Sequence, residues 1–267
     1  MLKDIDQLTE ELGNSKEFST SKLASSLKEK DQEIKYLKAE IDKNNHSLNE
    51  FIYAAAHALK SPVANLNLIS ILLDKSNDLE EIKSYFETIK SSLKKLDQTI
   101  HGMVHGFQVQ KIEDYSVSEI NFKELMHRLR PICIKNSGFG QFIVKQDFTD
   151  CPGITYTSNN LLEILSILFN NSIKYRSEDK ELEISIKSKR NDQFVVLEVQ
   201  DNGIGIDLAK FGKDLFQPFK KFSAKSDGTG LGLYLAKTLI SKNNGIIEID
   251  SEPNQGTLVK CYLKEMK

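Results

Sequence analysis

Two glycine-containing loops near the C-terminal end of the chain have the composition of a phosphate-binding site. They are the DNGIG sequence at residues 201–205 and the GTGLG sequence at residues 228–232. Glycines let the backbone approach a phosphate closely and present N–H donors without a Cβ in the way. The carboxylate of Asp201 can also accept a hydrogen bond from the exocyclic amine of adenine, a donor that proteins recognise on this base in DNA. Both loops are therefore candidates for contact with a nucleotide.

An asparagine and a lysine upstream add groups that suit a metal-bound phosphate. They belong to the NSIKY sequence at residues 171–175. The amide oxygen of Asn171 can bind Mg²⁺, and Lys174, about one helical turn later, can meet a phosphate as a point charge. Any one of the three segments could arise by chance, but the ordered set predicts a pocket for ATP and Mg²⁺.

The composition argues against several other classes of function. The chain has 267 residues and a net charge of −2, which indicates no broad surface for nucleic acid or an anionic membrane. Cys133, Cys151 and Cys261 are widely spaced and fit neither a disulfide framework nor a zinc site, so we expect a reduced cytoplasmic compartment. The sequence has no apolar run long enough to cross a bilayer and no signal peptide at its start. We therefore expect either a soluble protein or the cytoplasmic part of a longer one.

The first 113 residues carry the pattern of long helices. They contain one glycine before Gly102 and one proline, Pro62. A seven-residue apolar repeat with Asn44 at one seam position predicts a dimeric coiled coil over residues 1–47, in which a lone asparagine often fixes the register. The alternative is a single amphipathic helix packed on its own protein. The apolar residues of the repeat are Leu27, Ile34, Leu37, Ile41, Leu48 and Phe51.

Two further apolar stripes predict a helical hairpin at residues 48–113. The first stripe runs through residues 52–73 and the second through residues 79–107, with the turn signal Ser76-Asn77-Asp78 between them. Each helix has one apolar face, and pairing two hairpins into a four-helix bundle buries both faces. The hairpin therefore predicts a homodimer independently of the coiled coil.

His57 lies on the opposite side of the first hairpin helix from its apolar stripe. At about 100° per residue it is roughly 200° from both Ala55 and Leu59, so its imidazole is expected to face solvent. Pro62 removes the helical partner of the Ala58 carbonyl and is expected to bend the helix one turn later. An exposed imidazole beside such a bend suits a nucleophile that is approached from different directions. In isolation it would more often be an ordinary surface histidine, but the predicted ATP pocket downstream favours the functional interpretation.

The other histidines receive no role from the sequence. Two of them are spaced four residues apart on the second hairpin helix and could clasp a metal, but no third ligand is evident. The four residues are His46, His101, His105 and His127.

After Lys111 the pattern changes to short strands alternating with helices. Mixed elements of this kind predict an α/β sandwich at residues 119–267, with one sheet covered by helices on one face, behind a linker at residues 112–118. The predicted fold class of the whole chain is therefore α+β in two domains. Strands are expected at 142–148, 182–187, 194–200, 246–250 and 258–263, and helices at about 122–131, 159–174 and 230–242.

Taken together, these segments resemble the sensor histidine kinases of two-component signalling. The resemblance covers residues 48–267. The segment around His57 is similar to the phosphoacceptor segment of that family, and residues 161–262 are similar to its ATP-binding domain, which gyrase, the Hsp90 chaperone and MutL share. The resemblance implies a dimeric enzyme that transfers the γ-phosphoryl group of ATP to His57. It also implies that His57 passes this group to an aspartate on the receiver domain of a response regulator.

The resemblance also implies roles for individual residues. His57 would be phosphorylated, Asn171 would bind Mg²⁺, and Asp201 would bind adenine. A phenylalanine, Phe219, would belong to a lid over ATP. The other residues implied to form the nucleotide site are Lys174, Tyr175, Gly203, Gly205, Gly228, Thr229, Gly230, Leu231 and Gly232.

Two positions depart from the family pattern, and both bear on catalysis. Ala58 follows His57 where the family usually has an acidic residue that accepts the imidazole proton, an effect worth about 10²–10⁴-fold in rate. Ile167 stands one turn before Asn171, where the family more often has asparagine. These departures favour an alternative, a degenerate ATP-binding dimeric scaffold with weak or no kinase activity. A gyrase-type or chaperone-type ATPase would leave the hairpin and His57 unexplained.

Overall fold

The computed structural model describes residues 2–111, 116–222 and 228–266, without the side chains of residues 2–26, 40, 43, 44, 110 and 111. The chain divides into two compact units, residues 1–53 and 54–267. The boundary predicted near residue 47 stays a prediction. Among the described helices, none is both long enough and apolar enough to span a membrane.

The first unit is helical. Helix α1 spans Leu2–Leu73 and continues from this unit into the second. Four apolar residues of the predicted seam, Leu27, Ile34, Leu37 and Ile41, are exposed in the single chain. The predicted seam residue Asn44 lies outside the described side chains. The coiled coil therefore stays a prediction.

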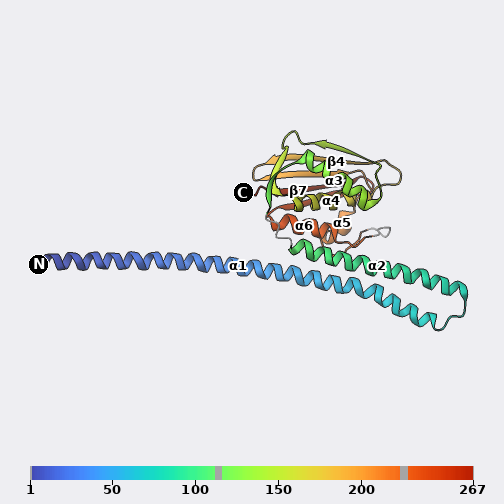
Figure 1. Cartoon of the computed structure of the whole chain (residues 1–267), viewed down its shortest axis with the longest axis horizontal. Coiled ribbons are helices and arrows are strands. Elements are labelled where there is room, and N and C mark those ends of the chain that lie inside the picture. The colour runs from blue at the N-terminus through green and yellow to red at the C-terminus, as the bar shows by residue number, and fades with distance from the viewer. Residues whose placement is uncertain (1, 112–115, 223–227, 267) are drawn as a thin grey trace. The chain divides into compact units, whose positions relative to one another are not determined.

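The second unit begins with an antiparallel helical hairpin, formed by the C-terminal part of α1 and by α2, Leu79–Lys111 (Figure 1). The predicted turn is confirmed, because residues 74–78 join the two helices. The Asp78 carboxylate caps α2 by accepting a hydrogen bond from the Glu80 N–H at 2.9 Å. Helix α1 continues past the buried Pro62 to Leu73.

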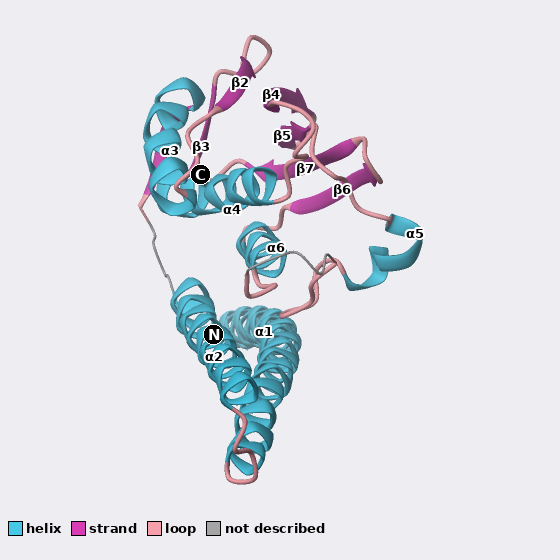
Figure 2. Ribbon diagram, turned by 90° about the vertical axis from the view of Figure 1, so that its right-hand side faces the viewer, coloured by secondary structure: helices cyan, strands magenta, loops and turns pink. Residues whose placement is uncertain are grey.

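The rest of the second unit is built on a five-stranded sheet of order β2-β4-β5-β7-β6. Neighbours β2 and β4 are parallel, and the other neighbours are antiparallel. Figure 2 shows helices α4 and α6 on one face of this sheet, with α3 packed beside α4. The predicted α/β sandwich is therefore confirmed. The bounds are β2 Phe142–Asp147, β4 Leu182–Asn191, β5 Phe194–Asp201, β6 Ile246–Glu252, β7 Gly256–Lys264, α3 Phe122–Ser137, α4 Ser158–Lys174 and α6 Gly232–Lys242.

A small second sheet departs from the sequence prediction. Strand β1, Val117–Asn121, pairs antiparallel with β3, Gly153–Thr157. The predicted linker is therefore wrong at its C-terminal end, where residues 117 and 118 begin β1, while residues 112–115 lie outside the described residues. Only Ile120 of β1 is buried, so its five residues carry no clear alternation. The pairing partner that makes them a strand lies far along the sequence.

The core lies between the sheet and its helices, where aliphatic side chains interlock. Cys261 belongs to this core, and its burial raises the pKa of the thiol to about 12, which keeps the thiol protonated and unreactive. The core residues of the sheet are Ile184, Ile186, Leu197, Val199 and Leu263, and those of the helices are Ile164, Leu165, Leu168, Leu239 and Ile240.

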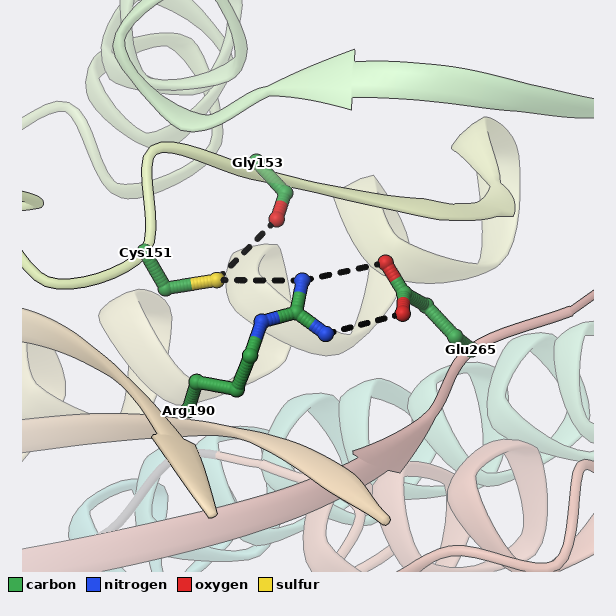
Figure 3. Close-up of polar contacts among 4 residues, drawn as sticks. All are labelled: Cys151, Gly153, Arg190 and Glu265. Atoms are coloured by element: carbon green, nitrogen blue, oxygen red, sulfur yellow. Dashed lines mark hydrogen bonds and ion pairs between the residues drawn. The ribbon is translucent and has the colours of Figure 1, made fainter. Parts of the chain in front are cut away.

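A polar cluster ties the end of the chain to the loop before β3 (Figure 3). Arg190 donates two hydrogen bonds to the Glu265 carboxylate, at 2.9 and 3.2 Å, and its Nη2 lies 3.9 Å from the Cys151 Sγ. The Cys151 thiol donates to the Gly153 carbonyl at 3.2 Å. Because the Arg190 and Glu265 side chains are 52% and 43% exposed, solvent screens their attraction, and the cluster mainly positions these segments.

Candidate functional site

A cavity of about 660 Å³ lies in the second unit, where the predicted nucleotide-binding segments meet. Its walls come from α4, the two glycine loops, the ends of β5 and β7, the short helix α5 (Leu208–Phe211) and α2. Such a volume is typical of small-molecule sites. The predicted site residues that line it are Asn171, Lys174, Tyr175, Asp201, Gly205, Gly228, Thr229, Gly230 and Gly232.

Asp201, the last residue of β5, presents its carboxylate in this cavity. Its Oδ1 accepts hydrogen bonds from the N–H groups of Gly203 at 2.9 Å and Thr257 at 3.2 Å. Its Oδ2 accepts one from the Ser172 hydroxyl at 2.9 Å. Burial raises the pKa of Asp201, and the three donors act in the opposite direction. The carboxylate is thus held in one orientation by three separate elements.

The first glycine loop is fixed by close backbone contacts on both sides. A Cβ on Gly203 would lie 2.5 Å from the Tyr175 carbonyl oxygen, which itself accepts a hydrogen bond from the Ile204 N–H at 3.0 Å. On the other side, the Asn254 N–H donates to the Ile204 carbonyl at 2.7 Å. Gly203 therefore does not line the cavity but lets the loop close against the end of α4.

The end of α4 places three predicted residues on the cavity wall. The Lys174 Nζ donates to the Tyr175 hydroxyl at 3.1 Å and lies over the position where Gly228 would carry a side chain. One turn earlier, the Asn171 amide atoms lie 3.6 Å from the Cβ position of Gly232. The first and second glycine loops are thus brought together by one helix. Ile167 also lines the cavity.

The second glycine loop leads into the N-terminus of α6, which begins at Gly232. The free N–H groups and the dipole of a helix N-terminus favour a phosphate. Leu231 was expected to present its N–H to phosphate, but its N–H donates to the Thr229 hydroxyl at 3.3 Å, and its side chain is buried. Gly230 has φ +76°, and a Cβ there would lie 2.5 Å from the Lys220 carbonyl oxygen.

The aromatic residues on the cavity wall differ from the one expected. Phe219 does not line the cavity, whereas Phe211 and Phe222 do, with ring centroids 5.3 Å apart. Phe216 lies beneath the Lys237 ammonium instead, at 5.1 Å. The sequence shows phenylalanines at all four positions but carries no signal for which rings face the ligand.

A second asparagine, Asn170, also lines the cavity, although the sequence pattern gave it no role. The Asn170 Nδ2 donates to the Ser166 hydroxyl at 3.2 Å, while its Oδ1 is buried and has no hydrogen-bond partner among the described residues. Amide oxygens are suitable ligands for Mg²⁺, which usually takes one or two protein ligands and completes its shell with phosphate and water. Asn170 and Asn171 together therefore fit a metal held mainly by the phosphates of a nucleotide. Among the described residues, no group of three or more His, Cys, Asp or Glu could hold a metal alone.

Two histidines of the hairpin differ in their relation to the cavity. His57 is exposed on α1, as predicted, and does not line the cavity. His105 of α2 does line it and lies 3.3 Å from Glu163, although the sequence gave it no role.

The residues that form most of this cavity match a known family. Residues 156–267 match histidine kinase-, DNA gyrase B-, and HSP90-like ATPase. This part of the chain is similar to the ATPase domains of that family. The match includes α4, both glycine loops and the strands β4 to β7, and it leaves out the helical hairpin.

Proteins named as histidine kinases are similar over a longer stretch. A methanogenesis regulatory histidine kinase, FilI of Methanothrix harundinacea, is 26% identical over 226 residues, which is 82% of this chain and 25% of that protein. The chain therefore spans a quarter of the length of this relative. The structure of histidine kinase AdeS from Acinetobacter baumannii superimposes with TM-score 0.51 and 17% identity, covering 79% of this chain and 98% of AdeS. The structure of full-length ShkA in complex with AMPPNP superimposes with TM-score 0.52 and 15% identity, covering 81% of this chain and 47% of ShkA.

Gly230→Ala tests the geometry of the second glycine loop, with Gly212→Ala as its matched control. A Cβ at residue 230 would collide with the backbone of Phe219 and Lys220, and alanine would have to adopt a left-handed φ, which costs about 1–2 kcal/mol. A Cβ at Gly212, where φ is −54°, meets nothing within 4 Å. We expect Gly230→Ala to weaken ATP binding about tenfold and Gly212→Ala to leave it unchanged, as measured by calorimetry. Equal affinities in the two variants would contradict this account of the loop.

Proposed function

We propose that this chain carries the catalytic part of a dimeric sensor histidine kinase. It transfers the γ-phosphoryl group of ATP to His57, and His57 then passes the group to an aspartate on the receiver domain of a response regulator. The observation that supports this most directly is the buried Asp201 carboxylate, which shares a cavity with two glycine loops in a chain that also carries an exposed His57. Because ATP and receiver domains are cytoplasmic, we expect the chain to act in the cytoplasm.

The cavity has a base end and a phosphate end. At the base end, Asp201 can accept a hydrogen bond from the exocyclic amine of adenine, and Ile204, Ile249 and Val259 add apolar surface for the ring. At the phosphate end, the second glycine loop, the N-terminus of α6 and Lys174 supply positive charge. The complex of ShkA with AMPPNP, an ATP analogue, supports this choice of ligand.

Asn171 and Asn170 would hold Mg²⁺ against the phosphates when the nucleotide is bound. The metal supplies charge neutralisation for phosphoryl transfer, in which positioning and electrostatics matter more than covalent chemistry. The chain's own contribution is to align the phosphates through the glycine loop and to exclude water beneath the ring pair of Phe211 and Phe222.

A second candidate, a degenerate ATP-binding scaffold, is favoured by two observed features. Ala58 leaves His57 without the adjacent carboxylate that would take up its proton. Ile167 occupies the cavity wall and lies 3.2 Å from the Cβ position of Gly232 through its Cγ2, so it puts a methyl group where an amide would add a polar contact. Neither feature removes the contacts proposed for adenine and phosphate.

The exposed face of α2 supports a homodimer. Every seventh residue of its apolar stripe faces solvent in the single chain: Phe86, Leu93 and Ile100 are 54%, 50% and 47% exposed. The members between them, Ile89 and Leu96, are partly buried within the hairpin. A seven-residue repeat of exposed apolar side chains is the pattern of a helix bundle that lacks its other half. A second copy of the chain would bury this face and the exposed seam of α1.

Asp201→Asn should weaken ATP binding by about 10- to 100-fold. Asparagine replaces one carboxylate oxygen, an acceptor, with an NH₂ group, a donor. That donor would face the Ser172 hydroxyl or the adenine amine, so a charged hydrogen bond worth about 1.5–3 kcal/mol is lost. The control is Asp207→Asn, because Asp207 also lines the cavity but caps α5, and asparagine caps helices equally well. Calorimetric titration with ATP distinguishes the two, and an unchanged affinity in Asp201→Asn would exclude adenine contact at this residue.

The transfer to His57 is tested by peptide mapping after incubation with γ-labelled ATP. Acid-labile label on the peptide that contains residue 57 is expected in the wild type and should disappear in His57→Gln, while His127→Gln retains it. Ala58→Glu should raise the labelling rate of His57, because it restores a proton acceptor worth about 10²–10⁴-fold. A rate that does not rise would refute the account of the missing acid. Intact ATP binding without any label would favour the scaffold.

Leu93→Glu should separate the dimer, because it places a charge on the exposed apolar face of α2. Ser91→Glu adds the same charge on the opposite side of the helix, at an exposed position, and should leave the dimer intact. Sedimentation velocity at matched concentrations measures the outcome. Dissociation of both variants, or of neither, would count against this face as the interface.

A further inference from the structure

Helix α2 has a second face that packs on the ATP-binding domain. Gly102, His105, Gly106 and Val109 share this face, because they are spaced by three and four residues. A Cβ on Gly102 would lie 2.8 Å from the Cγ2 of Thr229, so the absence of a side chain lets the second glycine loop sit directly on the helix. At its end, the buried Val109 offers its carbonyl to the ammonium of Lys242 at 3.3 Å. Figure 1 shows this end of α2 beside α6.

His105 stands on this face with its imidazole in the nucleotide cavity. Its Nε2 lies 3.3 Å from the Oε1 of Glu163, which comes from α4, and both residues line the cavity. Their side chains are 46% and 33% exposed, so the ring remains accessible to a ligand while it is paired. The hydrogen bond with Glu163 raises the pKa of His105, with burial acting against it and the charge of Glu163 adding to it.

Among the described histidines, only His105 combines a place in the cavity with a carboxylate from another element. His57 is outside the cavity and is followed by Ala58. His101 pairs with Asp97 on its own helix, also at 3.3 Å, and does not line the cavity. An imidazole that is oriented by a carboxylate and faces a bound electrophile has the arrangement of an activated nucleophile.

We propose that His105 is a second phosphoacceptor, which receives the γ-phosphoryl group of the nucleotide in the adjoining cavity while Glu163 accepts the imidazole proton. The proposal rests on the proposed binding of ATP in this cavity. Because Nε2 faces Glu163, Nδ1 carries the lone pair that attacks. The new bond joins Nδ1 to the γ-phosphorus, and the bond from that phosphorus to the bridging oxygen breaks. ADP leaves with the electron pair, and the Nε2 proton moves to Glu163.

The charges around His105 set the pH dependence of this step. Glu163 faces the ring from α4, and Lys242 of α6 reaches α2 one turn further on. On α2 itself, His101 and Asp97 are paired with each other. The other charged residues that line the cavity are Lys174, Lys220, Asp201 and Asp207. Because only the neutral ring attacks and pairing raises its pKa, the labelling rate of His105 should increase as the pH rises through that raised pKa.

Peptide mapping of the full chain after incubation with γ-labelled ATP tests the proposal. Label on the peptide that contains residue 105 is expected to persist in His57→Gln and to disappear in the double variant His57→Gln/His105→Gln. The matched control is His57→Gln/His101→Gln, which removes the neighbouring histidine with its own ion pair and should keep the label. At saturating ATP, Glu163→Gln should slow labelling of residue 105 by about 10²–10⁴-fold, as expected for loss of a general base.

A second readout needs no nucleotide. In the protein with labelled histidines, nuclear magnetic resonance should show the pKa of His105 raised above the ordinary histidine value, and Glu163→Gln should lower it. Label on residue 57 alone would overturn the proposal and leave the proposed function standing. A chain that binds no ATP would instead refute the proposed function. A His105→Gln variant that loses ATP affinity, in a protein whose residue-105 peptide carries no label, would show that His105 holds the nucleotide and does not accept phosphate.

Discussion

The carboxylate of Asp201 is the group on which the architecture of the site depends. A buried charge is tolerated only when hydrogen bonds replace its water, and here the donors come from α4, from the first glycine loop and from β7. The same three hydrogen bonds therefore satisfy the carboxylate and fix the relative positions of the elements that wall the cavity. The glycine loop fits between them because Gly203 and Gly205 carry no side chain to meet the surrounding backbone.

In the proposed dimer, helix α2 would link this site to the second copy of the chain, because it carries two distinct faces. One face repeats an exposed apolar residue every seven positions, and the other carries Gly102, His105 and Val109 against the ATP-binding domain. Since one rigid helix bears both, a rotation or shift of α2 changes both contacts at once.

The two departures from the family pattern lie in different places, because Ala58 follows the exposed His57 whereas Ile167 lines the cavity. In the proposed function, binding of a base and its phosphates would depend on Asp201, Lys174 and the second glycine loop, which all line the cavity. Proton removal from an attacking imidazole depends on a carboxylate beside it. The structure places such a carboxylate, Glu163, beside His105, whereas Ala58 follows His57. In the proposed function, nucleotide binding and the choice of acceptor are therefore separate.

The sequence alone determined the long helices, most of the strands, and the motifs around Asn171, Asp201 and Gly230, because each depends on local periodicity or on residues adjacent in the chain. Features that depend on contacts between segments far apart in the sequence were decided only by the tertiary structure. Strand β1 exists because it pairs with β3, and the cavity is lined by Phe211 and Phe222, not by Phe219, because of how residues 211–222 pack. His105 gained its partner only when folding brought α2 against α4. Contacts between elements far apart in the chain leave no periodic trace in either one, which is why the sequence did not reveal them.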